Sequence, residues 1–205
     1  MTIVILSNFF NHHQKPLADT LYRLTDGNLY FIETTDFANE QRLLGYRQYN
    51  ETYVMRYCSE TKEYIDHLIS VADAVIFGEA PLDLVKKRLK EEKLTFRDDE
   101  RRYKAFYKYL KYPIYTYNSI YLNKGYLLCA SAFCANDYRQ SGMSPDKCFK
   151  WGYFTEAKIY NHFNQLMAHK ASHKNGKVRL LWACRFIKWK HPEMAVEVAH
   201  MLKQE

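Results

Sequence analysis

Two adjacent histidines, His12 and His13, follow the first apolar run of the chain. Neutral imidazole both donates and accepts hydrogen bonds, so such a pair suits binding of a substrate hydroxyl, general base catalysis or metal ligation. Metal is the weakest of these options, because neither an HExxH motif nor a third ligand lies nearby. A surface or helix-capping pair is the structural alternative. The position at the end of an expected strand favours contact with a substrate.

Further polar residues follow other apolar runs. In an open parallel sheet the loops that follow the carboxyl ends of the strands converge on one edge, where ligands bind. We therefore predict that one cleft, with an acceptor-binding role considered below, is lined by Asn11, His12, His13, Glu79, Arg97 and Glu100. No loop carries a GxGxxG or Walker sequence, so neither a dinucleotide fingerprint nor a P-loop is supported.

The elements that must position these residues are short apolar runs that alternate with helical patterns. We expect seven strands, at residues 2–7, 29–34, 53–57, 74–78, 94–97, 126–131 and 178–183. Pro16 is expected at the start of the first helix and Gly27 at its C-terminal cap. Apolar stripes indicate further helices around residues 64–72, 82–89 and 194–202. Strands that are apolar throughout predict an α/β fold, a Rossmann-like parallel sheet with helices on both faces.

Composition excludes several classes of protein. The 205 residues are 47% hydrophobic and 26% charged, with 7 Gly and 5 Pro, which argues against disordered and collagen-like chains. No apolar run approaches the roughly 20 residues of a membrane-spanning helix, and no signal-peptide pattern precedes the first run, so we expect a cytoplasmic protein. Five cysteines without a CxxC pair favour core thiols over a disulfide framework or zinc ribbon.

The net charge of +7 calls for an anionic partner. Six of the basic residues lie in the segment 101–126, which has eight tyrosines and no acidic residue. Such a segment suits single-stranded RNA, an anionic membrane surface, or a packed helix with a solvated basic face. An RNA-binding α/β domain that uses residues 101–126 is therefore the alternative function, although no RRM or KH motif accompanies it.

The last forty residues of the chain contain an apolar run followed by two spaced basic residues. The apolar run 178–184 leads to Arg185, and Lys190 follows five residues later, just before an expected helix. This resembles the opening of the donor domain in bacterial GT-B, family-4-like (glycosyltransferase group 1) retaining glycosyltransferases. Cys184 and His191 stand where that family usually has glycine. Residues 147–154 resemble the end of the family's acceptor domain, and residues 11–14 and 72–78 resemble its first loop and an inner strand.

The resemblance implies the N-terminal half of a GT-B fold. Residues 1–175 would form an acceptor-binding Rossmann-like domain, and residues 176–205 the first strand–helix unit of a truncated donor-binding domain. Arg185 and Lys190 would then bind the donor phosphates, where fixed positive charge stabilises the leaving diphosphate. A chain that stops at Glu205 is expected to be inactive alone, and a catalytically dead scaffold is a third interpretation.

The full-length activity implied is retaining transfer of a sugar from a nucleotide-sugar donor. The acceptor would be a hydroxyl of a polysaccharide, lipopolysaccharide or lipid-linked glycan. The resemblance implies no cofactor and no metal beyond the donor as co-substrate. It favours no nucleic-acid partner. For a cytoplasmic enzyme of this kind, the basic residues and tyrosines of residues 101–126 favour contact with the anionic inner face of the plasma membrane.

Overall fold

The computed structural model describes residues 1–100, 124–140, 142–157, 159–172, 180–184 and 186–202. Arg185 and most of the basic, tyrosine-rich segment, residues 101–123, therefore lie outside the described residues. The described chain divides into two compact units, Met1–Ala157 and Lys158–Glu205. The sequence placed a boundary at residue 175, whereas the structure groups residues 159–172 with the C-terminal unit.

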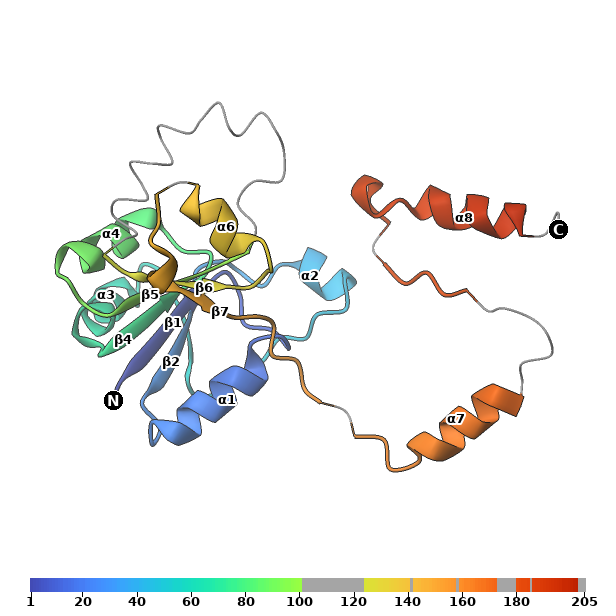
Figure 1. The fold of residues 1–205 in the computed structure, drawn as a ribbon. Helices are drawn as coiled ribbons and strands as arrows, with labels where there is room; N and C mark the ends of the chain where they lie inside the picture. The colour runs from blue at the N-terminus through green and yellow to red at the C-terminus, as the bar shows by residue number, and fades with distance from the viewer. Residues whose placement is uncertain (101–123, 141, 158, 173–179, 185, 203–205) are drawn as a thin grey trace. The chain divides into compact units, whose positions relative to one another are not determined.

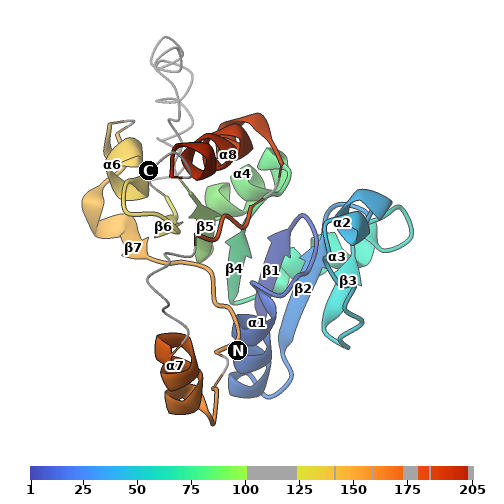
Figure 2. The same ribbon diagram turned by 90° about the vertical axis from the view of Figure 1, so that its right-hand side faces the viewer.

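The first unit contains one seven-stranded sheet in which every pairing is parallel. The strand order is β3-β2-β1-β4-β5-β6-β7 (Figures 1 and 2). The strands are β1 (Ile3–Ser7), β2 (Leu29–Glu33), β3 (Val54–Arg56), β4 (Ala74–Phe77), β5 (Thr95–Asp99), β6 (Tyr126–Cys129) and β7 (Cys148–Lys150). The predicted α/β fold with a Rossmann-like parallel sheet is confirmed.

Helices cover both faces of this sheet. They are α1 (Lys15–Leu24), α2 (Asn39–Leu43), α3 (Lys62–Val71), α4 (Leu82–Lys90) and α6 (Cys134–Arg139), with a 3-10 turn at Pro145–Lys147. Successive side chains of β1 point to opposite faces of the sheet and so contribute to two apolar clusters. Ile3 and Ile5 pack with Ala18 of α1. Val4 and Leu6 pack with α3 and α4. Each fully buried aliphatic side chain contributes about 1.5–3 kcal/mol, so these clusters hold the layers together.

The predicted start and end of the first helix are confirmed. Pro16 occupies the first turn of α1, and the Gly27 N–H donates to the Tyr22 carbonyl at 2.9 Å with a φ of +83°. Only glycine adopts that left-handed conformation without strain, so it ends the helix cleanly and returns the chain to β2.

The sequence predicted one outer strand wrongly and missed one short helix. Residues 180–183 form no strand, and the seventh strand is instead β7, which joins β6 through the pair Leu128↔Phe149. Residues 134–139, for which the sequence analysis predicts no helix, form helix α6. Strand β7 and helix α6 are both short, and each is stabilised by contacts with β6. The periodicity of the sequence does not reveal such contacts.

The strand order fixes where a ligand site belongs. The chain winds outward from β1 to β3 in one direction and from β4 to β7 in the other, so the direction of winding reverses between β1 and β4. In doubly wound sheets ligands bind at the carboxyl ends of the strands beside that reversal. We call the carboxyl ends of β1, β2, β4, β5 and β7, with the loops that follow them, the carboxyl edge.

The second unit contains α7 (Phe163–Ser172), a 3-10 turn (Lys188–Lys190) and α8 (Pro192–Met201). The predicted helix around residues 194–202 is therefore present, whereas α7 was not foreseen. The longest helices among the described residues have ten residues, and none of them is long and apolar enough to cross a bilayer.

Candidate functional site

The reversal point between β1 and β4 is closed by direct contacts. Asn8 Nδ2 donates to Glu79 Oε2 at 3.2 Å, and the Thr34 hydroxyl donates to the Glu79 carbonyl at 3.1 Å. A Cβ on Gly78 would lie 2.7 Å from Ser7 Oγ, so glycine is needed where the two strand ends approach. Glu79 is thereby held, exposed, beside the end of β1.

The loop between β1 and α1 is ordered by its own polar groups. Asn11 is 8% exposed, and its side-chain oxygen accepts from the His13 N–H at 2.9 Å. Gln14 reaches back to accept from the Asn11 N–H at 3.0 Å, as in a capping box. From the neighbouring strand, the Glu33 carboxylate accepts from the Phe10 N–H at 2.8 Å. The loop therefore presents its two histidines in a defined arrangement.

The two histidine rings lie together at this edge. Their centroids are 4.0 Å apart, and His13 Nδ1 is buried without a hydrogen-bond partner among the described residues. Burial, and secondly the neighbouring His12, lower the pKa of His13. A neutral imidazole is therefore favoured, which can donate to or accept from a ligand hydroxyl.

Asp98 and Asp99 end β5, and Glu100 follows them. The side chains of Asp98 and Asp99 lie on opposite faces of the sheet. Arg97 pairs with Leu127 in the register, so its side chain and that of Asp99 lie on the face covered by α6. There Asp99 accepts a hydrogen bond from the Tyr138 hydroxyl, and Arg97 Nε lies 3.7 Å from Asp99 Oδ2. Asp98 lies on the opposite face, the one that α1 covers.

Asp98 is the most perturbed carboxyl group at the carboxyl edge. Burial, then the neighbouring Asp99 charge, raises its pKa to about 6, although a hydrogen bond from the Trp151 side chain opposes the shift. A carboxyl group with such a pKa changes its protonation state close to neutral pH. It can accept a proton from a ligand hydroxyl or hold a hydrogen bond to one.

Tyr153 connects the acidic end of β5 to the histidine loop. Its hydroxyl donates to Glu100, its ring centroid lies 5.2 Å from that of His13, and the next residue, Phe154, donates its N–H to the His13 carbonyl at 3.3 Å. Burial and the Glu100 carboxylate raise the pKa of Tyr153. The segment after β7 therefore closes the site from the side opposite β1.

Six aromatic rings follow one another along this edge. In order they are Phe37, Phe9, Tyr46, His12, His13 and Tyr153, with centroid separations of 5.8, 5.4, 5.6, 4.0 and 5.2 Å. We call this set the aromatic row. Tyr153 is 61% exposed and His12 is also exposed, so part of the row faces solvent.

The structure brings most of the predicted residues together. His13 and Glu100 both contact Tyr153, and His12 stacks on His13. Glu79 lies at the same edge, at the end of the neighbouring strand β4. Asn11 is largely buried and orders the loop, and Arg97 lies within β5 on the α6 face, apart from the histidines.

Three residues of the site were not singled out from the sequence: Asn8, Asp98 and Tyr153. The run of three acids at the end of an apolar segment was visible, but only the pleat shows that Asp98 lies on the face covered by α1. Nothing local marks Tyr153, because its partners are 53 and 140 residues away.

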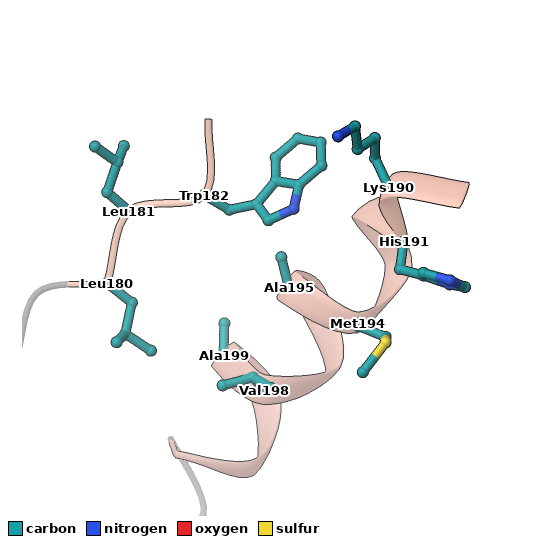
Figure 3. Close-up of a pocket in the computed structure, with 9 residues that line it drawn as sticks. All are labelled: Leu180, Leu181, Trp182, Lys190, His191, Met194, Ala195, Val198 and Ala199. Carbon is teal, nitrogen blue, oxygen red and sulfur yellow. The ribbon is translucent and has the colours of Figure 1, made fainter. Parts of the chain in front are cut away.

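The C-terminal unit holds a separate, largely apolar cavity of about 430 Å³. It lies between residues 180–182 and α8, with Trp182 and Lys190 at one end and Ala195, Val198 and Ala199 along the helix (Figure 3). His191 precedes α8 in a left-handed conformation with a φ of +50°. Lys190 therefore stands just before a helix N-terminus, where backbone N–H groups favour anions.

Within the described ranges, no group of three or more His, Cys, Asp or Glu side chains is arranged to hold a metal ion. Cys129, Cys134 and Cys148 do lie together beside α6, and burial raises the pKa of each thiol, to about 11 for Cys148. These thiols are protonated at neutral pH and act as core residues.

No protein-family model and no curated protein matches this chain. Among solved structures it is similar to the UDP-GlcNAc 2-epimerase of Methanocaldococcus jannaschii, at 16% identity and a TM-score of 0.46, over 75% of this chain and 46% of that one. It is also similar to the UDP-N-acetylglucosamine 2-epimerase of Rickettsia bellii, at 13% identity and a TM-score of 0.42, over 84% and 48% of the two chains. The chain spans about half the length of these structures.

Proposed function

We propose that residues 1–157 form the acceptor-binding domain of a GT-B glycosyltransferase. The carboxyl edge would bind the hydroxyl-bearing acceptor, and the nucleotide-sugar donor would be bound through Lys190 and Arg185 of the C-terminal unit. The observation that carries the proposal is the cluster of His13, Asp98 and Tyr153 at the carboxyl edge, beside the reversal point of the sheet.

The chemistry of this cluster suits a sugar. Sugar hydroxyls both donate and accept hydrogen bonds, and carboxylates and a neutral imidazole complement them. Aromatic rings cover the apolar C–H faces of a sugar and exclude water. The carboxyl groups of Glu79, Asp98 and Glu100 disfavour a diphosphate at this edge, which supports assigning the donor phosphates elsewhere.

The acceptor residues of this proposal are His12, His13, Glu79, Asp98, Glu100 and Tyr153. Asn11 positions His13, and no contact is assigned to Arg97. The resemblance in the sequence supports retaining transfer without a metal, so we assign hydrogen-bonding roles to these residues and no protein nucleophile.

Because the chain is expected to be inactive alone, transfer is tested with the chain joined to a complete GT-B donor-binding domain. The joined protein is incubated with a panel of UDP-, GDP- and dTDP-sugars and a pool of mono- and oligosaccharides. Release of nucleoside diphosphate together with a product one sugar heavier is expected, and both should fall at least tenfold in Asp98→Asn. The matched control is Glu63→Gln, an exposed carboxylate on α3. Hydrolysis without a heavier product, or equal activity in Asp98→Asn, would contradict the proposal.

Binding is tested separately by NMR, because it does not require a bound donor. Amide shifts of residues 8–13 and 98–100 should change with added sugar and stay constant with added UDP. The exposed His67 of α3 serves as the internal reference. Shifts caused by UDP at residues 8–13 would place the nucleotide, and not the acceptor, at this edge.

A further inference from the structure

The aromatic row is longer than one sugar ring requires. It links three parts of the chain: the loop after β1, the segment around α2, and the residues after β7. A single hexose placed on His13 and Tyr153 would leave Phe9 and Phe37 uncovered. The extent of the row needs an explanation beyond one acceptor hydroxyl.

The segment that carries Tyr46 is tied to this edge. Tyr46 donates its N–H to the Gln41 carbonyl at 3.0 Å, and its ring packs at 87° against Phe9 and at 38° against His12. Phe37 packs edge-on against Phe9. The rings are therefore positioned by one another, and a ligand that lies along them meets a surface that is already ordered.

Charge is distributed unevenly along the row. Asp98 and Glu100 lie at its Tyr153 end. At the Phe37 end, the Arg42 guanidinium lies 5.8 Å from the Phe37 ring centroid and already donates to Gln48. An acidic ligand would meet like charge over the end nearest the histidines.

We propose that the aromatic row binds a linear, uncharged oligosaccharide of several residues, whose end lies at His13 and Tyr153. This rests on the proposed function and narrows its acceptor to an extended neutral glycan. Phe9 and Phe37 bind sugars behind the terminal residue, and Tyr46 joins them to His12. They contribute affinity for the chain and make no contact with the hydroxyl that reacts.

Chain length provides the test. Dissociation constants are measured by calorimetry for linear α-1,4- and β-1,4-glucans and β-1,4-linked N-acetylglucosamine oligomers of one to six residues. Each aromatic contact contributes about 0.5–1.5 kcal/mol, or roughly 2- to 10-fold in affinity. Affinity in at least one series should therefore rise about tenfold or more between one and four residues. Oligogalacturonates of equal length should bind more weakly.

Two variants locate the effect. Phe37→Ala should remove the gain from the third residue onward while leaving the monosaccharide affinity unchanged, and Tyr153→Ala should weaken all lengths alike. Tyr64→Ala, on the exposed face of α3, is the matched control and should change nothing. Because Tyr153 is 61% exposed, its removal keeps the fold even if Phe37→Ala proves unstable.

The outcomes separate this inference from the proposed function. Equal affinity for one and six residues, or tighter binding of the oligogalacturonates, overturns the neutral extended glycan and leaves a sugar-binding edge intact. Length-dependent binding without sugar transfer supports the inference and contradicts the transferase. Failure of every glycan to bind overturns both.

Discussion

At the amino edge of the sheet the Arg88 guanidinium is 2% exposed and donates to the carbonyls of Ile69, Ala72, Asp73 and Leu94. At the carboxyl edge His13 Nδ1 has no partner within the described residues, and Asp98 has a raised pKa. Both clusters are polar and lie at the ends of the same strands. The first cluster satisfies its polar groups with the protein itself, whereas the second keeps a buried imidazole nitrogen without a partner among the described residues.

This difference in hydrogen bonding distinguishes the structural cluster around Arg88 from the proposed binding site at the carboxyl edge. Arg88 closes the C-terminus of α3, where carbonyls lack helical partners, and joins it to the start of β5. Its burial lowers the pKa of the guanidinium, but five N–H donors still match the carbonyls around it. The unpartnered His13 Nδ1 and the raised pKa of Asp98 are both unfavourable for folding, as the proposed binding role at the carboxyl edge predicts.

The sharpest test of this contrast is Arg88→Met. It removes the donors and leaves several buried carbonyls unsatisfied, at about 1–3 kcal/mol each, so we expect a loss of about 3–5 kcal/mol in the free energy of unfolding. Chemical denaturation measures it, with Lys87→Met on the same helix as an exposed control. A loss below about 1 kcal/mol would show that the amino edge is not a structural cluster.

Gly78→Ala strains the carboxyl edge at its narrowest point. The added Cβ would meet Ser7 Oγ at 2.7 Å, so the ends of β1 and β4 must separate, at about 1–3 kcal/mol. Unfolding of the single variant and of Ser7→Ala/Gly78→Ala should show partial recovery in the double variant. Gly152→Ala, where a Cβ would have no neighbour within 4 Å, is the control. Equal losses at both glycines would contradict the close approach.

Asp98→Asn should act in the opposite direction on stability. Because the folded-state pKa is raised to about 6, folding favours the protonated carboxyl, and stability falls as pH rises from the unfolded pKa of about 4 through 6. Allowing for solvent screening, we expect Asp98→Asn to be about 1–2 kcal/mol more stable than the parent at pH 7.5. The difference should be smaller at pH 4. Urea unfolding across this range measures it, and a variant that is less stable at pH 7.5 would argue that Asp98 is charged and well paired.

The smallest expected effect concerns the histidine pair. The pKa of His13 is lowered, so the folded state favours neutral imidazole, and this contribution to stability is lost as pH falls through 6.5 toward the folded pKa. His12→Asn removes one cause and should raise the His13 pKa, with a change in stability of only a few tenths of a kcal/mol. NMR titration of the His13 ring follows it. An unchanged titration would mean that burial alone sets the shift.

Local signals in the sequence predicted much of the first unit. The inner strands were predicted from their apolar runs, because these strands are buried on both faces. Helix α1 was predicted from Pro16 and Gly27, because its two ends depend on single residues. The rule for parallel sheets then placed the histidine loop and Glu79 at one edge. Residues 180–183, the described part of the strand predicted at 178–183, form no strand, because a short apolar run becomes a strand only when a neighbour pairs with it.

Tertiary structure decided the details that give the site its chemistry. The pleat of β5 turned Asp98 toward the α1 face and Arg97 toward α6, although the two are adjacent in sequence. The pairing of β7 with β6 carried Tyr153 to His13, 140 residues away. The sequence by itself thus determined which edge bears the polar loops, because strand direction and loop position follow from local pattern. Which side chains meet there depends on register and long-range packing, which only the folded sheet specifies.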